Sequence, residues 1–174
     1  MRKFDFYIDK ITNSIENAVN ADTAETEISP LLATDLKEIL KKNGWRFNWK
    51  EEFKNPERKL YKLVVKGGEM IEGLICLQLA DGYIEMHLIE SAPHNIGKSK
   101  KWIGVAGNLV AFACKMSFEA GFAGAVGFLA KTRLIEHYAD KFGAILIYKN
   151  RMSISGNSAR KLVNSYYKNY IYGR

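Results

Sequence analysis

A glycine-bearing stretch in the middle of the chain, residues 101–108, has the residue types of an anion-binding loop. It reads Lys-Trp-Ile-Gly-Val-Ala-Gly-Asn, after an extended run at 83–93 and before a helical run at 109–120. A loop in this position turns backbone N–H groups outward, and the positive end of the helix dipole adds to them. The stretch predicts a site for a phosphate or pyrophosphate; the alternative is an ordinary helix start without a ligand. Its glycine spacing is neither that of a P-loop nor that of a dinucleotide fold.

Groups that could move protons lie on the extended run just before this loop. Glu85, His87 and Glu90 are the ionisable residues there. Strand alternation puts Glu85 and His87 on one face, and puts Glu90 on the other face with the even-numbered apolar residues 84–88. A carboxylate or imidazole near a strand end can serve as a general base.

Apolar spacing and turn residues predict the elements that would position these groups. The expected strands are 27–32, 59–65, 71–79, 83–90, 125–130, 144–148 and 151–155, and the expected helices are 4–20, 35–42, 109–120, 132–142 and 158–170. Pro30 restricts the first strand to a sheet edge, and Thr34 is a cap for the helix at 35–42. Residues 45–57 interleave aromatic and charged side chains without a clear period, which predicts a loop.

The spacing basic-x-x-Gly-x-Ala, from Lys101 to Ala106, resembles the pyrophosphate loop of the GNAT superfamily of N-acetyltransferases. The order of elements is also similar over residues 26–155, and recognisable motifs cover 83–146. The resemblance implies an α/β (α+β) fold with a mixed, mostly antiparallel central sheet flanked by helices. Residues 1–174 would then form a single acyltransferase domain with extra N- and C-terminal helices.

The same resemblance implies acetyl-CoA as the acyl donor and a primary amine as the acceptor. In this family the strand before the loop splays from its neighbour, and the pantetheine arm lies in the gap. Here the splaying strand is 83–91 and its neighbour is 125–130. The implied cofactor-binding residues are Ile89, Ser91, Lys101, Ile103, Gly104, Val105, Ala106, Gly107, Asn108 and Lys131. Lys98 and Lys100 lie where phosphates could also be met.

The resemblance also implies catalytic residues, which act by general base and general acid assistance to direct attack. Glu90 is the first choice for the base, Glu85 the second and His87 the third. Tyr138 is the expected acid, on the helix after the next strand. Counting from residue 131 places Tyr138 on the family tyrosine, whereas counting back from Gly143 shifts it by one residue and leaves the acid to another group such as His137.

Composition and charge narrow the class of protein. The chain has 174 residues, 47% hydrophobic, and a formal net charge of +7. Residues 94–174 carry thirteen bases and three acids, which suits a polyanion, whereas residues 71–93 carry four acids and no base, which suits an amine. No membrane span or signal segment is seen, so a cytoplasmic protein is expected. Cys76 and Cys114 are expected in the core, and no metal-ligand spacing occurs.

The charge and the aromatic segment are also compatible with other functions. A non-enzymatic module of the same fold could bind nucleic acid through the basic half and the aromatic segment 45–50. An acetyltransferase acting on RNA-bound amines would combine both ideas. The acceptor itself is not encoded in any pattern, because its specificity would lie in the loop at 43–57. The terminal helices offer a face for a homodimer.

Overall fold

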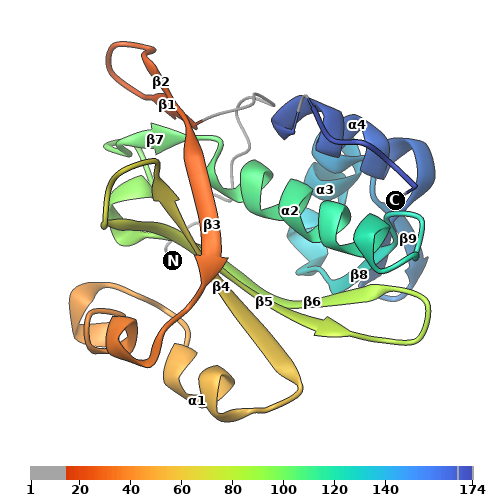
Figure 1. The fold of residues 1–174 in the computed structure, drawn as a ribbon, viewed down its shortest axis with the longest axis horizontal. Helices are drawn as coiled ribbons and strands as arrows, with labels where there is room; N and C mark the ends of the chain where they lie inside the picture. Colours follow the sequence, from red (N-terminus) through yellow and green to blue (C-terminus); the bar gives the residue numbers. More distant parts are fainter. Residues whose placement is uncertain (1–14, 168, 174) are drawn as a thin grey trace.

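The computed structural model describes residues 15–167 and 169–173, and a seven-stranded sheet forms its centre (Figure 1). The strands follow the order β3 (Thr26–Pro30), β4 (Arg58–Val65), β5 (Ile71–Leu79), β6 (Ile84–Ser91), β8 (Val126–Leu129), β10 (Arg151–Ile154) and β9 (Ile145–Tyr148). Every neighbouring pair is antiparallel except β6 and β8, which run parallel. The expected mixed, mostly antiparallel sheet is confirmed, with β3 at one edge.

Helices cover both faces of this sheet (Figure 1). The long helix α2 (Val105–Glu119) packs on one face together with α3 (Ile135–Phe142) and α4 (Gly156–Tyr166). The other face carries α1 (Trp49–Lys54) and two 3₁₀ turns, η1 (Ala33–Lys37) and η2 (Lys41–Asn43). Two further 3₁₀ turns, η3 (Pro93–Asn95) and η4 (Thr132–Leu134), follow strands β6 and β8.

Two apolar clusters hold the layers together. The larger one lies under α2 and includes Leu109, Ile75 and Val126, all fully buried. The smaller one joins Trp49 and Leu74 beneath the 31–54 segment. Burial of such side chains stabilises the fold by about 1.5–3 kcal/mol each. No helix among the described residues combines the length and apolar character needed to span a bilayer.

The helix predicted at 35–42 is wrong, and so is the loop predicted at 45–57. The N–H groups of Glu38 and Ile39 bond to carbonyls three residues back, which makes 3₁₀ turns. Asp35, not Thr34, supplies the capping oxygen, since its carboxylate accepts the Leu32 N–H at 2.8 Å. These tight turns allow Ile39 and Trp45 to reach the smaller apolar cluster.

The two ends of the chain also differ from expectation. Most of the predicted helix 4–20 lies outside the described residues; where it is described, it is wrong, because β1 (Ile15–Asn17) is a strand. It pairs with β2 (Thr23–Ala24) and with β7 (Trp102–Ile103). The C-terminal helix is present as α4, but it begins two residues earlier and ends four residues earlier than the predicted 158–170.

Candidate functional site

A gap opens between the parallel strands β6 and β8. They pair only at Ile84 with Val126 and at Glu85 with Gly127. Beyond Glu85, β6 continues to Ser91 along β5 alone among the described elements. One edge of β6 therefore presents main-chain N–H and C=O groups without a strand partner, as the splayed geometry predicted.

The main-chain direction of β6 identifies which residues face this gap. The N–H of Ala92 donates to the Glu72 carbonyl on β5 at 2.9 Å. Because main-chain groups alternate along a strand, Glu90 also faces β5, whereas Ile89 and Ser91 turn theirs toward the gap. A ligand with an extended, amide-bearing chain could add to this edge as an extra strand does.

Helix α2 begins at the open end of the gap. Gly104 is its N-cap residue, with φ of +93°, a conformation that glycine adopts without steric cost. The first helical bond joins the Asn108 N–H to the Gly104 carbonyl at 3.0 Å. The N–H groups of Val105, Ala106 and Gly107 thus lie in the first turn, where a helix supplies no acceptor and where an anion is favoured.

The residues before Gly104 are engaged differently. Ile103 and Trp102 pair with β1, and Lys101 accepts the Ala18 N–H and donates its own N–H to the His94 carbonyl. The side-chain amide of Asn108 donates to Thr26 Oγ1 at 2.8 Å and so ties α2 to β3. These contacts concentrate the available donors of the loop at residues 104–107.

Trp102 adds one further donor beside the loop. Its indole Nε1 is buried and has no hydrogen-bond acceptor among the described residues. A buried unpaired donor costs about 1–3 kcal/mol. A polar ligand within reach of this N–H would remove that cost.

A β-bulge at His87 changes the expected faces of β6. Leu77 pairs with Met86 and Cys76 pairs with Leu88, which leaves His87 as the extra residue. The predicted alternation is therefore wrong beyond Met86: Leu88 packs in the smaller cluster, on the face opposite Met86. Glu90 lies on that α1 face too.

Glu90 is held by the segment that leads into α1. The carboxylate is buried and accepts three hydrogen bonds. The donors are the Arg46 N–H at 2.6 Å, the Trp49 indole N–H at 2.6 Å and the Phe47 N–H at 3.5 Å. Its oxygen atoms are thus used to fix residues 46–49 over the strand.

Glu85 and His87 occupy the same face closer to the point where β6 and β8 part. Arg151 of β10 forms a two-pronged ion pair with Glu85, with Nη1–Oε1 at 2.8 Å. His87 lies 2.7 Å from the Gln78 amide oxygen through Nε2. Burial, and then the positive charge of Arg58, lower the pKa of His87 from its usual 6.5, so its ring is neutral at pH 7.

Tyr138 lies in α3 and is buried against the strand β8. Its ring stacks on Phe142 at 5.8 Å and meets Phe128 edge-on at 5.2 Å. Burial raises the pKa of Tyr138 to about 12, which keeps its hydroxyl protonated. No hydrogen-bond partner of that hydroxyl is found among the described residues.

Positive charges gather at the end of β8. Burial, and then Arg133 and Arg46, lower the pKa of Lys131. The four acids of residues 71–93, in contrast, do not form the open acidic surface that the sequence suggested. Glu90 and Glu72 are buried in hydrogen bonds, Glu85 pairs with Arg151, and Asp81 lies in the β5–β6 turn.

Two groups were not anticipated from sequence. Arg151, the partner of Glu85, lies far from it in the sequence, and no motif marks it as part of a site. His94, which lines a cavity on the α1 face, bonds through Nε2 to the buried Glu72 at 2.6 Å. The described part of the chain contains no group of three or more His, Cys, Asp or Glu side chains arranged for a metal ion.

Solved structures with the same fold are acetyltransferases. Spermidine N-acetyltransferase from Vibrio cholerae, in complex with CoA and spermine, is 14% identical; the match has a TM-score of 0.55 and covers 78% of this chain and 98% of that one. A tyrosine-to-phenylalanine mutant of the toxin AtaT, bound to acetyl-CoA and to the C-terminus of the antitoxin AtaR, is 15% identical, with a TM-score of 0.56 and coverage of 79% and 97%.

A third structure agrees with these two. PaiA N-acetyltransferase from Thermoplasma acidophilum, in complex with coenzyme A, is 13% identical, with a TM-score of 0.51 and coverage of 75% and 99%. No protein-family model matches the chain, and no curated protein matches it by sequence. The likeness lies in the fold: this chain has the fold of the GNAT N-acetyltransferases, as its sequence suggested.

Proposed function

We propose that the protein is an N-acetyltransferase that moves an acetyl group from acetyl-CoA to a primary amine. One observation carries this proposal: β6 and β8 separate after two paired residues, and a helix with a glycine N-cap begins at the open end of the gap. An open strand edge and an anion-binding helix start thus lie in line. This is the shape that a pantetheine arm with a pyrophosphate requires.

Acetyl-CoA supplies the acetyl group as a thioester. The main-chain groups of Ile89 and Ser91 hold its extended arm, and the N–H groups at 104–107 hold its phosphates. Lys131, at the end of β8, adds positive charge near the mouth of the gap.

His87 is the base that the geometry favours. It lies at the bulge where β6 leaves β8, and a neutral ring can take a proton from the attacking amine. Glu85 is neutralised by Arg151, and Glu90 would have to give up a hydrogen bond to residues 46–49 before it could accept a proton. We assign Glu90 the role of a positioning residue for that segment.

Tyr138 is the proposed acid, because its buried hydroxyl stays protonated and can return a proton to the departing sulfur.

The proposed function is tested by measuring the amine-dependent release of free thiol from acetyl-CoA across a panel of primary amines. Tyr138→Phe should lower kcat about 100-fold or more. Tyr148→Phe, on an exposed tyrosine, is the matched control and should leave kcat unchanged. Absence of thiol release with every amine would refute the proposed function.

A further inference from the structure

His87, the proposed base, has one of its two ring nitrogens bonded inside the protein. Its Nε2 lies 2.7 Å from Oε1 of Gln78, on the neighbouring strand β5. Gln78 pairs with Glu85 across the β5–β6 ladder, and His87 is two residues further along β6. A long side chain can reach such a diagonal neighbour on the same face of a sheet. The position of the His87 ring is therefore tied to the central sheet.

A second contact fixes which way the Gln78 amide points. Its Nε2 donates to the Glu57 carboxylate at 3.2 Å, from the segment between α1 and β4. The NH₂ group of an amide only donates and a carboxylate only accepts, so Oε1 of Gln78 has to face His87. An amide oxygen can bond to the ring only where the ring nitrogen carries a proton. The neutral ring is thus the Nε2–H tautomer, with its lone pair on Nδ1.

The charged groups around the ring come from several elements. Burial is the largest influence on the pKa of His87 and lowers it; Arg58 of β4 and Arg151 of β10 lower it further, and Glu85 opposes them. Glu85 is at the same time paired with Arg151, and Glu57 reaches the ring only through the Gln78 amide. Among the described residues, no carboxylate forms a hydrogen bond or ion pair with the ring itself.

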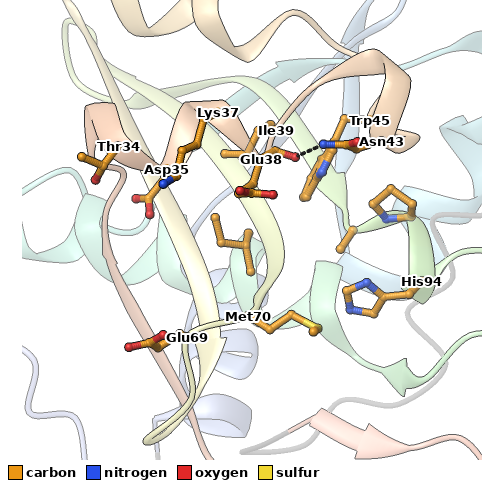
Figure 2. A pocket seen from close by; sticks show the side chains of 13 residues that line it. Thr34, Asp35, Lys37, Glu38, Ile39, Asn43, Trp45, Glu69, Met70 and His94 are labelled. Atoms are coloured by element: carbon orange, nitrogen blue, oxygen red, sulfur yellow. Dashed lines mark hydrogen bonds between the residues drawn. The ribbon is translucent and has the colours of Figure 1, made fainter.

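An amide and a carboxylate act differently as partners of an imidazole. A bonded carboxylate stabilises the imidazolium through its opposite charge and raises the pKa, whereas an amide accepts the same hydrogen bond without a net charge. The chain contains both arrangements. His94, which lines the cavity on the α1 face shown in Figure 2, has its Nε2 2.6 Å from a carboxylate oxygen of Glu72. The amide of Gln78 can orient His87 and still leave its ring neutral near pH 7.

We propose that Gln78 is a positioning residue for His87, and that Nδ1 of His87 is the atom that takes the proton from the attacking amine. This inference rests on the proposed function. As the amine nitrogen bonds to the acetyl carbon and the bond from that carbon to sulfur breaks, one amine proton goes to Nδ1. The Nε2–H bond to Gln78 stays in place and holds the ring. The sulfur takes its own proton from Tyr138, and proton exchange with solvent then restores both groups.

The first experiment determines the tautomer by nitrogen NMR on the full chain with isotope-labelled histidine, without acetyl-CoA. The chain has three histidines, and His87→Gln identifies the signals of His87. At a pH above the pKa, Nδ1 should give the signal of a bare nitrogen and Nε2 the signal of a protonated one. A neutral ring with its proton on Nδ1 would overturn the inference.

The second experiment follows the pKa of His87 in the same spectra, in variants that change its partner. Gln78→Leu removes an acceptor that favours the imidazolium, so the pKa should fall. The double variant Glu57→Gln/Gln78→Glu moves the carboxylate next to the ring at constant net charge, so the pKa should rise by about one unit or more. Glu69→Gln, which removes an exposed acid before the far end of β5, is the matched control and should leave the pKa unchanged.

The third measurement is the pH dependence of kcat for thiol release with the most active amine of the panel. The midpoint of the acid limb should fall in Gln78→Leu and rise in the double variant, because a loss of packing alone would not move it in opposite directions. A pKa that neither variant changes, or a midpoint that does not follow the pKa, would overturn this inference and leave the proposed function intact. The expected NMR result without thiol release from any amine would refute the proposed function, and the role of Nδ1 with it.

Discussion

Replacing Glu90 with glutamine should destabilise the protein strongly, because the buried carboxylate accepts bonds on both oxygen atoms. Oε1 takes the Arg46 N–H, and Oε2 takes the N–H groups of Trp49 and Phe47. Glutamine keeps only one acceptor oxygen, and its NH₂ group must face a donor. Losing a hydrogen bond to a charged group costs about 1.5–3 kcal/mol, and a buried donor left unpaired costs about 1–3 kcal/mol more. We therefore expect a loss of about 3–5 kcal/mol in the free energy of unfolding.

Urea denaturation followed by tryptophan fluorescence measures this change, since Trp45 and Trp49 lie in the affected segment. Asp81→Asn provides the control, with an expected change below about 0.5 kcal/mol for an exposed site. If Glu90 were a general base without a structural role, Glu90→Gln would instead lower kcat and leave the free energy of unfolding unchanged. A Glu90→Gln protein as stable as the wild type would refute the reasoning about residues 46–49.

Three further predictions concern the packing of α2 on β5 and the two residues proposed to transfer protons, His87 and Tyr138. Gly73→Ala should cost about 1–3 kcal/mol in unfolding experiments and weaken acetyl-CoA binding, because a Cβ there would lie 2.6 Å from Val105 Cγ1 and push α2 off β5. The rate should rise with pH and level off with a midpoint below 6.5, since His87 must be neutral to act and its pKa is lowered; His87→Gln should remove this limb. No alkaline loss of rate should come from Tyr138 up to about pH 10, because its pKa is about 12; a loss there that Tyr138→Phe abolishes would contradict the raised pKa of Tyr138.

The central strands could be predicted because alternation and turn residues act over a few neighbours. Strands β4, β5 and β6 lie within about one residue of their predicted bounds, separated by the Gly67-Gly68 and Asp81-Gly82 turns. The edge position of β3 followed from Pro30 alone. These features depend on residues close to one another in the chain, so they can be predicted from the sequence.

The remaining differences come from distant contacts or from signals that were overlooked. The bulge at His87 depends on how β6 fits β5, and nothing in its own residues marks it. The 3₁₀ turns form because Ile39 and Trp45 must reach strands that follow them in the chain. The start of helix α1 could have been predicted from the sequence. Asn48 accepts the Glu51 N–H at 3.3 Å, and an Asn followed three residues later by Glu is typical of a helix N-terminus.

The central claim is that acetyl-CoA binds between β6 and the start of α2. The most direct measurement is the thermal unfolding midpoint of wild type and Gly104→Glu, each with and without acetyl-CoA. At about 100 times its Kd the ligand adds about 2.7 kcal/mol, a rise of about 5–10 °C for a chain of this size. The variant places a negative side chain on the glycine N-cap and should lose the rise.

Gly97→Glu is the matched control, since Gly97 has a similar φ of +80° but open space around it. It has the same backbone strain and should keep the rise. The unfolding midpoint should rise with acetyl-CoA in wild type and Gly97→Glu, and should not rise in folded Gly104→Glu. A folded wild-type protein with no rise at saturating acetyl-CoA would show that acetyl-CoA does not bind between β6 and the start of α2.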